Sequence, residues 1–370
     1  MIFNDFDVVL TSYGVLLRDA DLLKDIQFHY IILDESQKIK NPVSKTGRVV
    51  RKLKADHRLC LTGTPIENNL TELWSQMTFL NPGLLGSFKQ FNDSFVKVIS
   101  KENDTDTVQL LKRTIYPFIL RRTKDKVAKD LPEKTEAIHF CEMDKNQEKV
   151  YNFWKNSIRV EILKEIKRKG IKKSGFKVLE GLLRLRQICN HPVLVQSDYK
   201  KKSSKFEEFK MMLSKVVVEG HKVLVFSQFV QMLEIMRGFL DENKINYELL
   251  TGNTRKREEH VKNFKNNDNV KVFLISLKAG GFGLNLTEAD YVFHYDPWWN
   301  PAVEMQATDR THRIGQDKSV FVYKFITKNS IEEKILSLQE KKRNLVREII
   351  STESSLLKNL TKKDIEILFE

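Results

Sequence analysis

Cysteine, proline, glycine and long apolar runs are all scarce in this sequence. Of 370 residues, only 3 are cysteine, 8 proline and 15 glycine. Cys60, Cys141 and Cys189 stand too far apart for a zinc knuckle or a disulfide framework, so we expect three core thiols. No apolar run approaches the roughly 18 residues that a membrane-spanning helix needs. The opening residues, MIFNDFDVVL, carry acids where a secretion signal would carry lysines, which indicates a cytoplasmic or nuclear protein that is not secreted.

Acidic residues are in the minority among the charged side chains. The chain has 63 Lys and Arg against 49 Asp and Glu, which gives a formal net charge of +14. Such an excess favours phosphate-backbone partners, because this attraction does not depend on base sequence. A surface of solvated lysines would give the same composition. Charge therefore makes nucleic acid the leading partner and leaves an ordinary basic surface as the alternative.

An α/β rhythm occurs twice in the chain. Between residues 7 and 80, the strand-like runs DVVLTS, YIILDE and RLCLTG alternate with helix-length segments, which is typical of parallel βαβ units. The same rhythm returns between 221 and 327 in KVLVFSQF, YELLTG, VKVFLIS, DYVFHYD and SVFVYKFIT. From 81 to 205 the pattern is helical and basic, with apolar residues three and four apart. We therefore expect an α/β protein with two parallel-sheet domains around a helical insertion.

Three of the loops that follow strands carry candidate functional residues. YIILDE delivers Asp34 and Glu35 to the carboxyl edge, where open α/β sheets bind ligands, although a strand followed by a solvated loop would look the same. After VFLIS, the glycines of LKAGGFGLNLTEAD let a backbone approach a phosphate closely. After DYVFHYD, we expect Arg310 and Arg313 one helical turn apart on one face, where they could clamp a γ-phosphate. Surface arginines that cap a helix are the alternative interpretation.

Taken in order, these segments resemble the Swi/Snf-type branch of the superfamily-two helicase-like ATPases. The likeness covers nearly the whole chain, and its most specific parts are DPWWNP and QATDRTHRIGQ. The resemblance implies two RecA-like parallel-sheet domains with helical insertions: a partial first domain at 1–80, helical protrusions and a linker at 81–205, a second domain at 206–328, and a helical brace at 329–370. It also implies an ATPase that double-stranded DNA stimulates, and that translocates along DNA and remodels nucleoprotein without separating the strands.

The resemblance also implies a role for particular residues. Asp34 would hold the Mg²⁺ that accompanies ATP, Glu35 would orient or deprotonate the attacking water, and Gln37 would link this loop to Thr62 or to the second domain. Arg310 and Arg313 would be arginine fingers, with Gly283 near the nucleotide and Gln306 lining the same face. Backbone amides and small side chains in loops would hold DNA at Thr11, Ser12, Gln228, Thr251, Gly252, Ser276, Lys278 and Gly280. The family usually has Ala or Gly at Ser36 and often His at Gln37, and neither departure touches the carboxylates.

One family motif is absent from these 370 residues. In the family a phosphate loop, G-x-x-x-x-G-K-[ST], precedes the acids, and the residues before Asp34 do not contain it. The nearest match, GIKKSGFK at 170–177, lacks the Lys-Ser/Thr pair, and we expect a loop there with no phosphate role. We therefore expect the carboxyl-terminal part of a translocase, whose hydrolysis needs a phosphate loop from elsewhere, such as a separate chain. Its first sheet would then expose an apolar edge unless another polypeptide covers it.

Two other functions remain open at this stage. A non-catalytic DNA-binding or adaptor protein could keep the same surfaces, although it has no need of both carboxylates and both arginines. A strand-separating helicase of a related branch is the third hypothesis, and DPWWNP and HRIGQ disfavour it.

Overall fold

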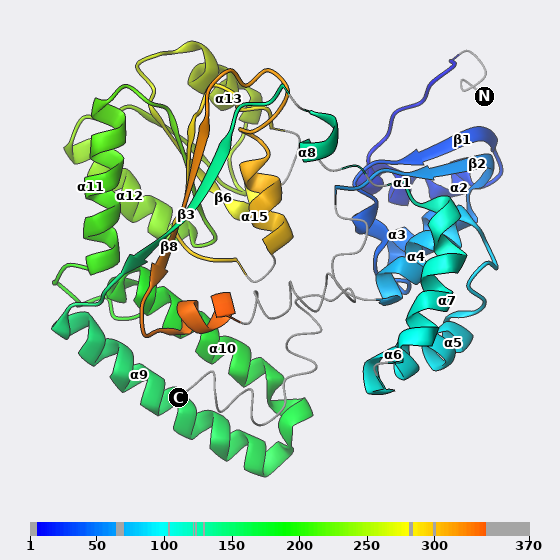
Figure 1. The fold of residues 1–370 in the computed structure, drawn as a ribbon, viewed down its shortest axis with the longest axis horizontal. Helices are drawn as coiled ribbons and strands as arrows, with labels where there is room; N and C mark the ends of the chain where they lie inside the picture. Colours follow the sequence, from blue (N-terminus) through cyan, green and yellow to red (C-terminus); the bar gives the residue numbers. More distant parts are fainter. Residues whose placement is uncertain are drawn as a thin grey trace. The chain divides into compact units, whose positions relative to one another are not determined.

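The structure, a computed structural model, describes residues 6–63, 70–102, 104–120, 122, 124–128, 130–280, 284–298 and 301–337. These residues form two compact units that divide between positions 121 and 122. We call them the first unit and the second unit, and each is described by itself. Figure 1 shows the elements of both. Within the described ranges, no helix is both long and apolar enough to cross a membrane.

The first unit contains a parallel pair of strands, β1 (Gln27–Leu33) and β2 (Lys54–Cys60). The predicted strand segments YIILDE and RLCLTG begin inside β1 and β2, respectively. Helices α1 (Tyr13–Arg18), α2 (Ala20–Leu23), α3 (Lys45–Lys52) and α4 (Leu70–Leu80) accompany them, with a short 3-10 helix η2 (Ser36–Ile39) directly after β1. Leu33, Ile39, Val50 and Phe79 are buried together and form the core of this layer. This core fixes the carboxyl ends of β1 and β2, where the candidate acids follow.

Apolar side chains of the two strands are exposed on the side away from this core. Ile32 and Leu59, which pair across the strands, are 56% and 43% exposed, and Tyr30 is likewise exposed. These side chains lie on a face of the two-stranded sheet, and the expected exposure of an apolar sheet edge stays a prediction. The strand predicted for DVVLTS is wrong, since residues 7–10 form no ladder and Val8 and Leu10 are exposed. Strand propensity needs a neighbouring strand to be realised, and the described part of the chain offers residues 7–10 none.

Short helices complete the first unit. They are α5 (Phe88–Phe91), α6 (Lys97–Glu102) and α7 (Thr105–Ile115), with the π-helix η3 (Asn92–Val96) and the 3-10 helix η4 (Tyr116–Phe118). Ser87 and Gln90 form a capping box at the start of α5, and the Asp104 carboxylate caps α7. Their apolar faces meet α4 in a second core that includes Met77, Phe91 and Leu111.

The second unit is built on a six-stranded parallel sheet. Its strands are β3 (Lys134–Cys141), β4 (Val223–Ser227), β5 (Tyr247–Leu250), β6 (Val272–Ser276), β7 (Tyr291–His294) and β8 (Val320–Thr327), in the spatial order β3-β8-β7-β4-β6-β5. The five strands predicted between 221 and 327 are confirmed. β3 was not predicted, because it lies in a stretch whose pattern is mainly helical. It pairs with β8 over its whole length at the edge of the sheet.

Helices cover both faces of this sheet. Helices α11 (Ser204–Val218) and α12 (Val230–Glu242) share a core with Val225, Leu274 and Phe293. On the other face, Leu224, Phe273 and Val292 pack with residues of α13 (Arg257–Asn266), α14 (Leu277–Gly280) and α15 (Pro301–Thr308). Strands buried on both faces are apolar at every position, which is why VLVFS and VFLIS could be recognised from sequence.

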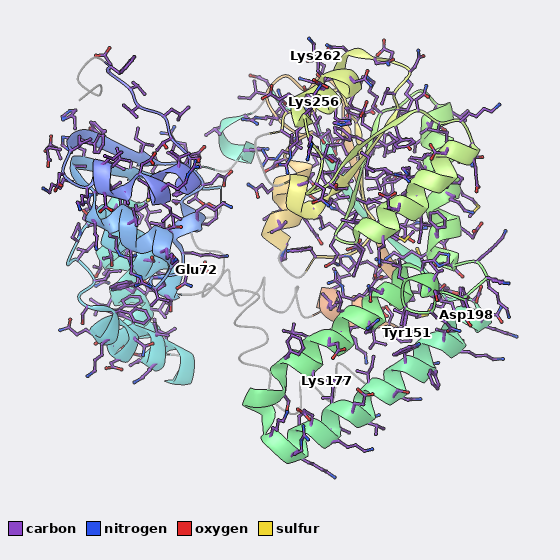
Figure 2. The ribbon with its side chains drawn as sticks, turned by 180° about the vertical axis from the view of Figure 1, so that it is seen from behind. Glu72, Tyr151, Lys177, Asp198, Lys256 and Lys262 are labelled. Carbon is purple, nitrogen blue, oxygen red and sulfur yellow. The ribbon has the colours of Figure 1, made fainter. Side chains whose placement is uncertain are left out.

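A helical hairpin extends from the second unit between β3 and β4. Helices α9 (Lys145–Lys169) and α10 (Ile171–Asn190) turn at Gly170, whose φ of 76° is costly for other residues. Tyr151 of α9, labelled in Figure 2, is buried. Its hydroxyl accepts a hydrogen bond of 2.8 Å from the backbone amide of Ile331. The predicted loop at 170–177 is wrong, since these residues turn at Gly170 and continue into α10. The short helices α8 (Lys124–Val127) and η5 (Pro192–Leu194) complete this unit.

Candidate functional site

In the first unit, a hydrogen-bonded chain follows β1. Glu35 donates its backbone amide to Asp34 Oδ1 at 2.9 Å. The Gln37 amide group donates to Glu35 Oε2 at 2.5 Å and accepts from Thr62 Oγ1 at 3.1 Å. The predicted link between Gln37 and Thr62 is therefore present. Because Thr62 follows β2, this chain ties the two strand ends together and orients the Glu35 carboxylate.

The backbone around these acids is held in a specific conformation. Glu35 has a φ of 49°, a left-handed conformation that few residues other than glycine adopt. Ser36 is buried, and its amide donates to the Leu61 carbonyl at 3.0 Å, so the turn is fastened to the residue that follows β2. Tyr13 donates its hydroxyl to the Asp34 carbonyl at 2.8 Å. Burial, with the nearby Cys60, Asp34 and Glu35, raises the pKa of Tyr13 well above its usual value, which keeps this donor protonated.

The donor set at the end of β1 fits a magnesium ion accompanied by a nucleotide. Asp34 is exposed, Glu35 is half-buried beside it, and carboxylate oxygens are the ligands that Mg²⁺ prefers in proteins. Exposure of Asp34 allows water and phosphate to complete such a coordination shell. Glu35, held by Gln37, is the carboxylate whose orientation is fixed. The arrangement therefore separates a candidate metal ligand from a candidate base.

Two predicted DNA-binding positions lie near the start of the first unit. Thr11 and Ser12 are both exposed. Ser12 is the N-cap of α1, and its Oγ accepts from the Val15 amide at 3.3 Å. This capping bond is sufficient reason for a serine there.

The other predicted DNA-binding residues meet at one edge of the second sheet. Gln228 follows β4, Thr251 and Gly252 follow β5, and Ser276 ends β6, with Lys278 and Gly280 in α14 directly after it. Because β4, β6 and β5 are parallel neighbours, their carboxyl ends share this edge. Thr251 and Gly252 are accessible, whereas Ser276 is buried. The structure therefore brings these positions together on adjacent loops.

The two predicted arginine fingers are arranged differently from the expectation. Helix α15 ends at Thr308, so Arg310 and Arg313 lie in the turns that follow it, and the expectation of one shared helix face is wrong. Arg310 is buried and Arg313 is exposed. Tertiary bonds set this path: the Arg310 carbonyl accepts from Leu286 at 2.9 Å, and the His312 ring bonds the Pro132 carbonyl at 2.8 Å. Gln306 is half-buried on α15, and Gly283 lies outside the described residues.

The sequence analysis missed a buried charged cluster beside the DNA-binding candidates. Arg186 of α10 and Asp296, which follows β7, lie 3.8 Å apart and are both buried. Gln228 bonds both of them, at 3.0 Å to Arg186 Nη1 and 2.6 Å to Asp296 Oδ2. The only available signal was the position of Arg186 in LRQICNHP and of Asp296 in DPWWNP, two segments of the family resemblance.

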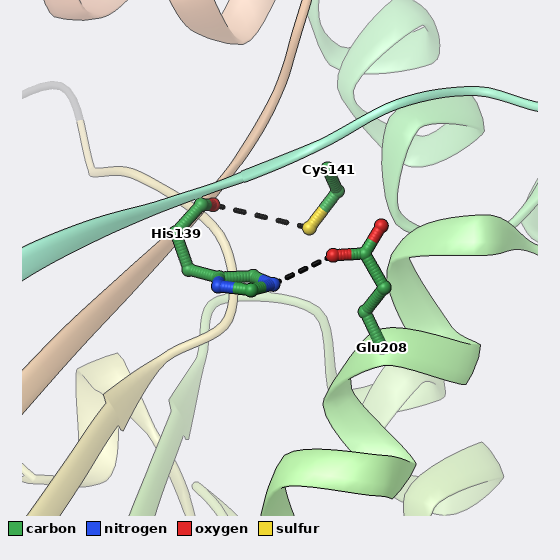
Figure 3. A group of neighbouring side chains, drawn as sticks. All are labelled: His139, Cys141 and Glu208. Atoms are coloured by element: carbon green, nitrogen blue, oxygen red, sulfur yellow. Dashed lines mark hydrogen bonds and ion pairs between the residues drawn. The ribbon is translucent and has the colours of Figure 1, made fainter.

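One further group has the composition of a metal site. His139 and Cys141 of β3 and Glu208 of α11 place their ligand atoms within 4.8 Å of one another (Figure 3). His139 Nε2 and Glu208 Oε2 already share a hydrogen bond of 2.6 Å. Burial raises the pKa of the Cys141 thiol to about 12, which disfavours the thiolate that a metal requires. We therefore interpret the group as a hydrogen-bonded pair beside a core thiol.

Comparisons with known proteins agree with this arrangement of two α/β regions. The SNF2-related domain family matches residues 1–194, and the helicase conserved C-terminal domain family matches residues 204–315. The putative ATP-dependent helicase/translocase YwqA of Bacillus subtilis is 39% identical over 99% of this chain and 40% of its own length. An uncharacterized ATP-dependent helicase of Mycoplasma pneumoniae is 38% identical over 98% of this chain and 35% of its own. This chain thus spans less than half the length of these curated relatives.

A solved structure gives the same assignment. The Sulfolobus solfataricus SWI2/SNF2 ATPase core in complex with dsDNA is 40% identical and aligns with a TM-score of 0.56 over 99% of this chain and 78% of that chain. Its fold supports the α/β fold class predicted from the sequence, with RecA-like domains. The chain therefore belongs to the SWI2/SNF2 family of ATP-dependent, helicase-like proteins.

Proposed function

We propose that this chain is part of a Swi/Snf-type motor that uses ATP and Mg²⁺ to translocate along double-stranded DNA and to remodel DNA-bound protein. The observation that carries the proposal is the bonded series Asp34, Glu35, Gln37 and Thr62, which joins the ends of two parallel strands. The solved structure of the Sulfolobus solfataricus ATPase core in complex with dsDNA supports the choice of partner. This function would place the protein at the bacterial nucleoid or in the nucleus.

The two carboxylates divide the work of phosphoryl transfer in this proposal. Asp34 would hold Mg²⁺, which neutralises charge on the phosphate oxygens when bound. Glu35 would orient the attacking water or accept its proton. The hydrogen bond from Gln37 limits the rotation of the Glu35 carboxylate, and Thr62 holds Gln37 in turn. A displacement of Thr62 at the end of β2 would therefore move the Glu35 carboxylate through the Gln37 side chain.

The residues of the second unit would supply the remaining contacts. We assign Arg310 and Arg313 as arginine fingers, with Gly283 and Gln306 beside the nucleotide, so hydrolysis would require the two RecA-like domains to close. The assigned DNA contacts are Thr11, Ser12, Gln228, Thr251, Gly252, Ser276, Lys278 and Gly280. The same proposal divides the chain into a partial first domain at 1–80, helical protrusions and a linker at 81–205, a second domain at 206–328 and a brace at 329–370, of which 338–370 lie outside the described residues. Loops with hydroxyls and amides suit a motor that must hold phosphates at every sequence.

Hydrolysis in this proposal also needs a phosphate loop, which these 370 residues do not contain. We assign that role to a segment that docks on the first unit, whether it belongs to the same polypeptide or to a separate chain. The exposed apolar surface around Ile32 and Leu59 supports such docking, because a protein core surface of this kind is normally covered.

The test is DNA-stimulated ATP hydrolysis by the 370-residue chain, with and without an added polypeptide that carries a phosphate loop. We expect turnover only when both are present. In that mixture Glu35→Gln should abolish hydrolysis and leave nucleotide binding intact, because the amide cannot accept a proton but keeps the shape of the side chain.

Three results would contradict the proposal. Turnover retained by Glu35→Gln would remove Glu35 from the catalytic role. Inactivity of the mixture, with salt-sensitive DNA binding intact, would favour a non-catalytic adaptor instead. Unwinding of a duplex by the active mixture would indicate a strand-separating helicase.

A further inference from the structure

Arg186 is a charged side chain almost completely removed from solvent. It lies on α10 and is 1% exposed. Its guanidinium donates from Nη1 to Gln228 Oε1 at 3.0 Å and from Nη2 to the Pro297 carbonyl, and it lies 5.8 Å from the centre of the Phe229 ring. A buried guanidinium is tolerated only where fixed acceptors replace water. Here those acceptors come from two loops at the carboxyl edge of the sheet.

The carboxylate beside Arg186 is equally well surrounded. Asp296 is fully buried, 3.8 Å from Arg186. Ser227 Oγ donates to Asp296 Oδ1 at 2.5 Å, and Gln228 Nε2 donates to Oδ2 at 2.6 Å. Both ends of the Gln228 amide are thus occupied, one by the arginine and one by the aspartate. In this arrangement Gln228 bridges two charges, which explains its position without a DNA contact.

The location of this cluster within the sheet is informative. β4 lies between β6 and β7. From β4 the chain connects to β5, which lies on the β6 side of β4. From β7 it connects to β8, which lies on the opposite side of the adjacent pair β4 and β7. Open α/β sheets form their ligand crevice between two strands whose connections diverge in this way. Arg186, from a helix outside the sheet, occupies that point and bonds the residues that follow β4 and β7.

The same bonds continue into the helix that precedes the candidate arginine fingers. Directly after Pro297, the Trp298 amide donates to Glu304 Oε1 of α15 at 2.6 Å. Glu304 is also paired with Lys324 of β8 at 3.0 Å. The turn at 296–298 is therefore fixed at one end by Arg186 and at the other by α15.

We infer that Arg186 is a positioning residue: it fixes the 296–298 turn from the helical hairpin, and so sets where α15 and the following Arg310 and Arg313 lie relative to the sheet. This inference rests on the proposed function for its catalytic meaning. The structural part of the inference, that Arg186 fixes the turn and α15, is independent of the proposed function, because the arginine, the turn and the helix all belong to the second unit. Movement of α10 would thus be transmitted to the arginines through one guanidinium.

Hydrogen–deuterium exchange of the full 370-residue chain tests the structural part. Arg186→Met keeps an unbranched side chain and removes the charge, and Arg184→Met, at an exposed position on the same helix, is the matched control. In Arg186→Met we expect amide exchange in α15 to accelerate at least about tenfold, because the turn that anchors the helix loses its buried ion pair. Exchange in α12 should not change. Arg186→Lys should restore part of the protection, since it keeps the charge but not the forked donors.

Unchanged α15 exchange in a folded Arg186→Met protein would overturn the inference. If that variant does not fold, Gln228→Leu provides the same comparison, because it removes the bridge and leaves Arg186 in place. It should also accelerate exchange in α15, and protection equal to the parent protein would again overturn the inference.

Hydrolysis separates this inference from the proposed function. In the mixture with a phosphate-loop polypeptide, Arg186→Met should lower kcat and leave KM for ATP within about twofold, since it displaces the arginines rather than the nucleotide site. An equal loss in Arg184→Met would refute the specific role of Arg186. If the parent mixture does not hydrolyse ATP, the proposed function fails, and the exchange comparison still decides whether Arg186 fixes α15.

Discussion

Removal of one partner from the buried ion pair between Lys205 and Glu332 should strongly destabilise the second unit. Lys205 of α11 donates to both carboxylate oxygens of Glu332 at 2.9 Å, and the two side chains are 1% and 0% exposed. Lys205 also donates to Asn190 Oδ1 at 3.3 Å and lies 4.9 Å from the centre of the Tyr295 ring. Through these contacts the pair joins α11, the end of α10 and the residues that follow β8.

Lys205→Met removes the cation and keeps most of the side-chain volume. Glu332 would retain the Thr327 amide as a donor, at 2.8 Å, but its charge would lose its buried counter-ion. Removal of one partner from a buried pair costs about 3–5 kcal/mol. Because the free energy of unfolding of a whole domain is about 5–15 kcal/mol, we expect a large fall in the urea midpoint.

The assay is urea unfolding followed by circular dichroism, with Lys202→Met as the control. Lys202 is 3.7 Å from Glu207, and the two side chains are 79% and 31% exposed, so its loss should change the free energy by at most about 0.5 kcal/mol. The double variant Lys205→Met/Glu332→Gln should recover part of the loss, because no unpaired charge is then buried. A Lys205→Met protein as stable as the control would refute the reasoning.

Three other variants have expected outcomes. In the mixture with a phosphate-loop polypeptide, Arg313→Ala should slow ATP hydrolysis roughly 10³- to 10⁵-fold, which is the contribution of arginine fingers in other enzymes. A near-normal rate would show that Arg313 has a structural role only. Burial, with repulsion from Lys324, lowers the pKa of His294 from 6.5 to about 3. The unfolded chain then binds a proton between these values that the folded chain does not, so stability falls as pH drops through this window. His294→Phe, whose ring can keep the stacking on Phe226, should flatten that fall, and an unchanged slope of unfolding free energy against pH would contradict the assignment. Ile32→Lys should reduce self-association in light scattering more than Val43→Lys, which changes an exposed residue outside the sheet; equal effects would show that the apolar strand surface is not the contact.

The sequence predicted the strands that contain runs of consecutive apolar residues, whether or not both of their faces are buried. β4 and β6 are apolar up to their closing serines because helices cover both faces, whereas β1 was recognised from YIIL although Tyr30 and Ile32 are exposed. β3 is an edge strand with mixed burial, so its pattern is weak. The residues 7–12 have strand propensity without a partner, and propensity alone does not form a ladder.

Side-chain arrangement was less predictable than secondary structure. The helical spacing of Arg310 and Arg313 was misleading, because bonds to Leu286 and Pro132 end the helix before them. The contact between Arg186 and Pro297 joins residues 111 positions apart, and no local pattern carries that information. The link from Gln37 to Thr62 was anticipated only through the family resemblance.

The position of β3 determines which fragments of the protein keep an intact second sheet and where the chain can accept insertions or deletions. This strand precedes the α9–α10 hairpin yet lies in the same sheet as β4 to β8, so the hairpin departs from one unit and returns to it. A fragment that began at residue 206 would lack an edge strand and expose β8, whereas one that began ahead of residue 134 would keep the sheet whole. Both ends of the hairpin are fastened, and its turn at Gly170 is the place where insertions or deletions would leave the sheet unaffected.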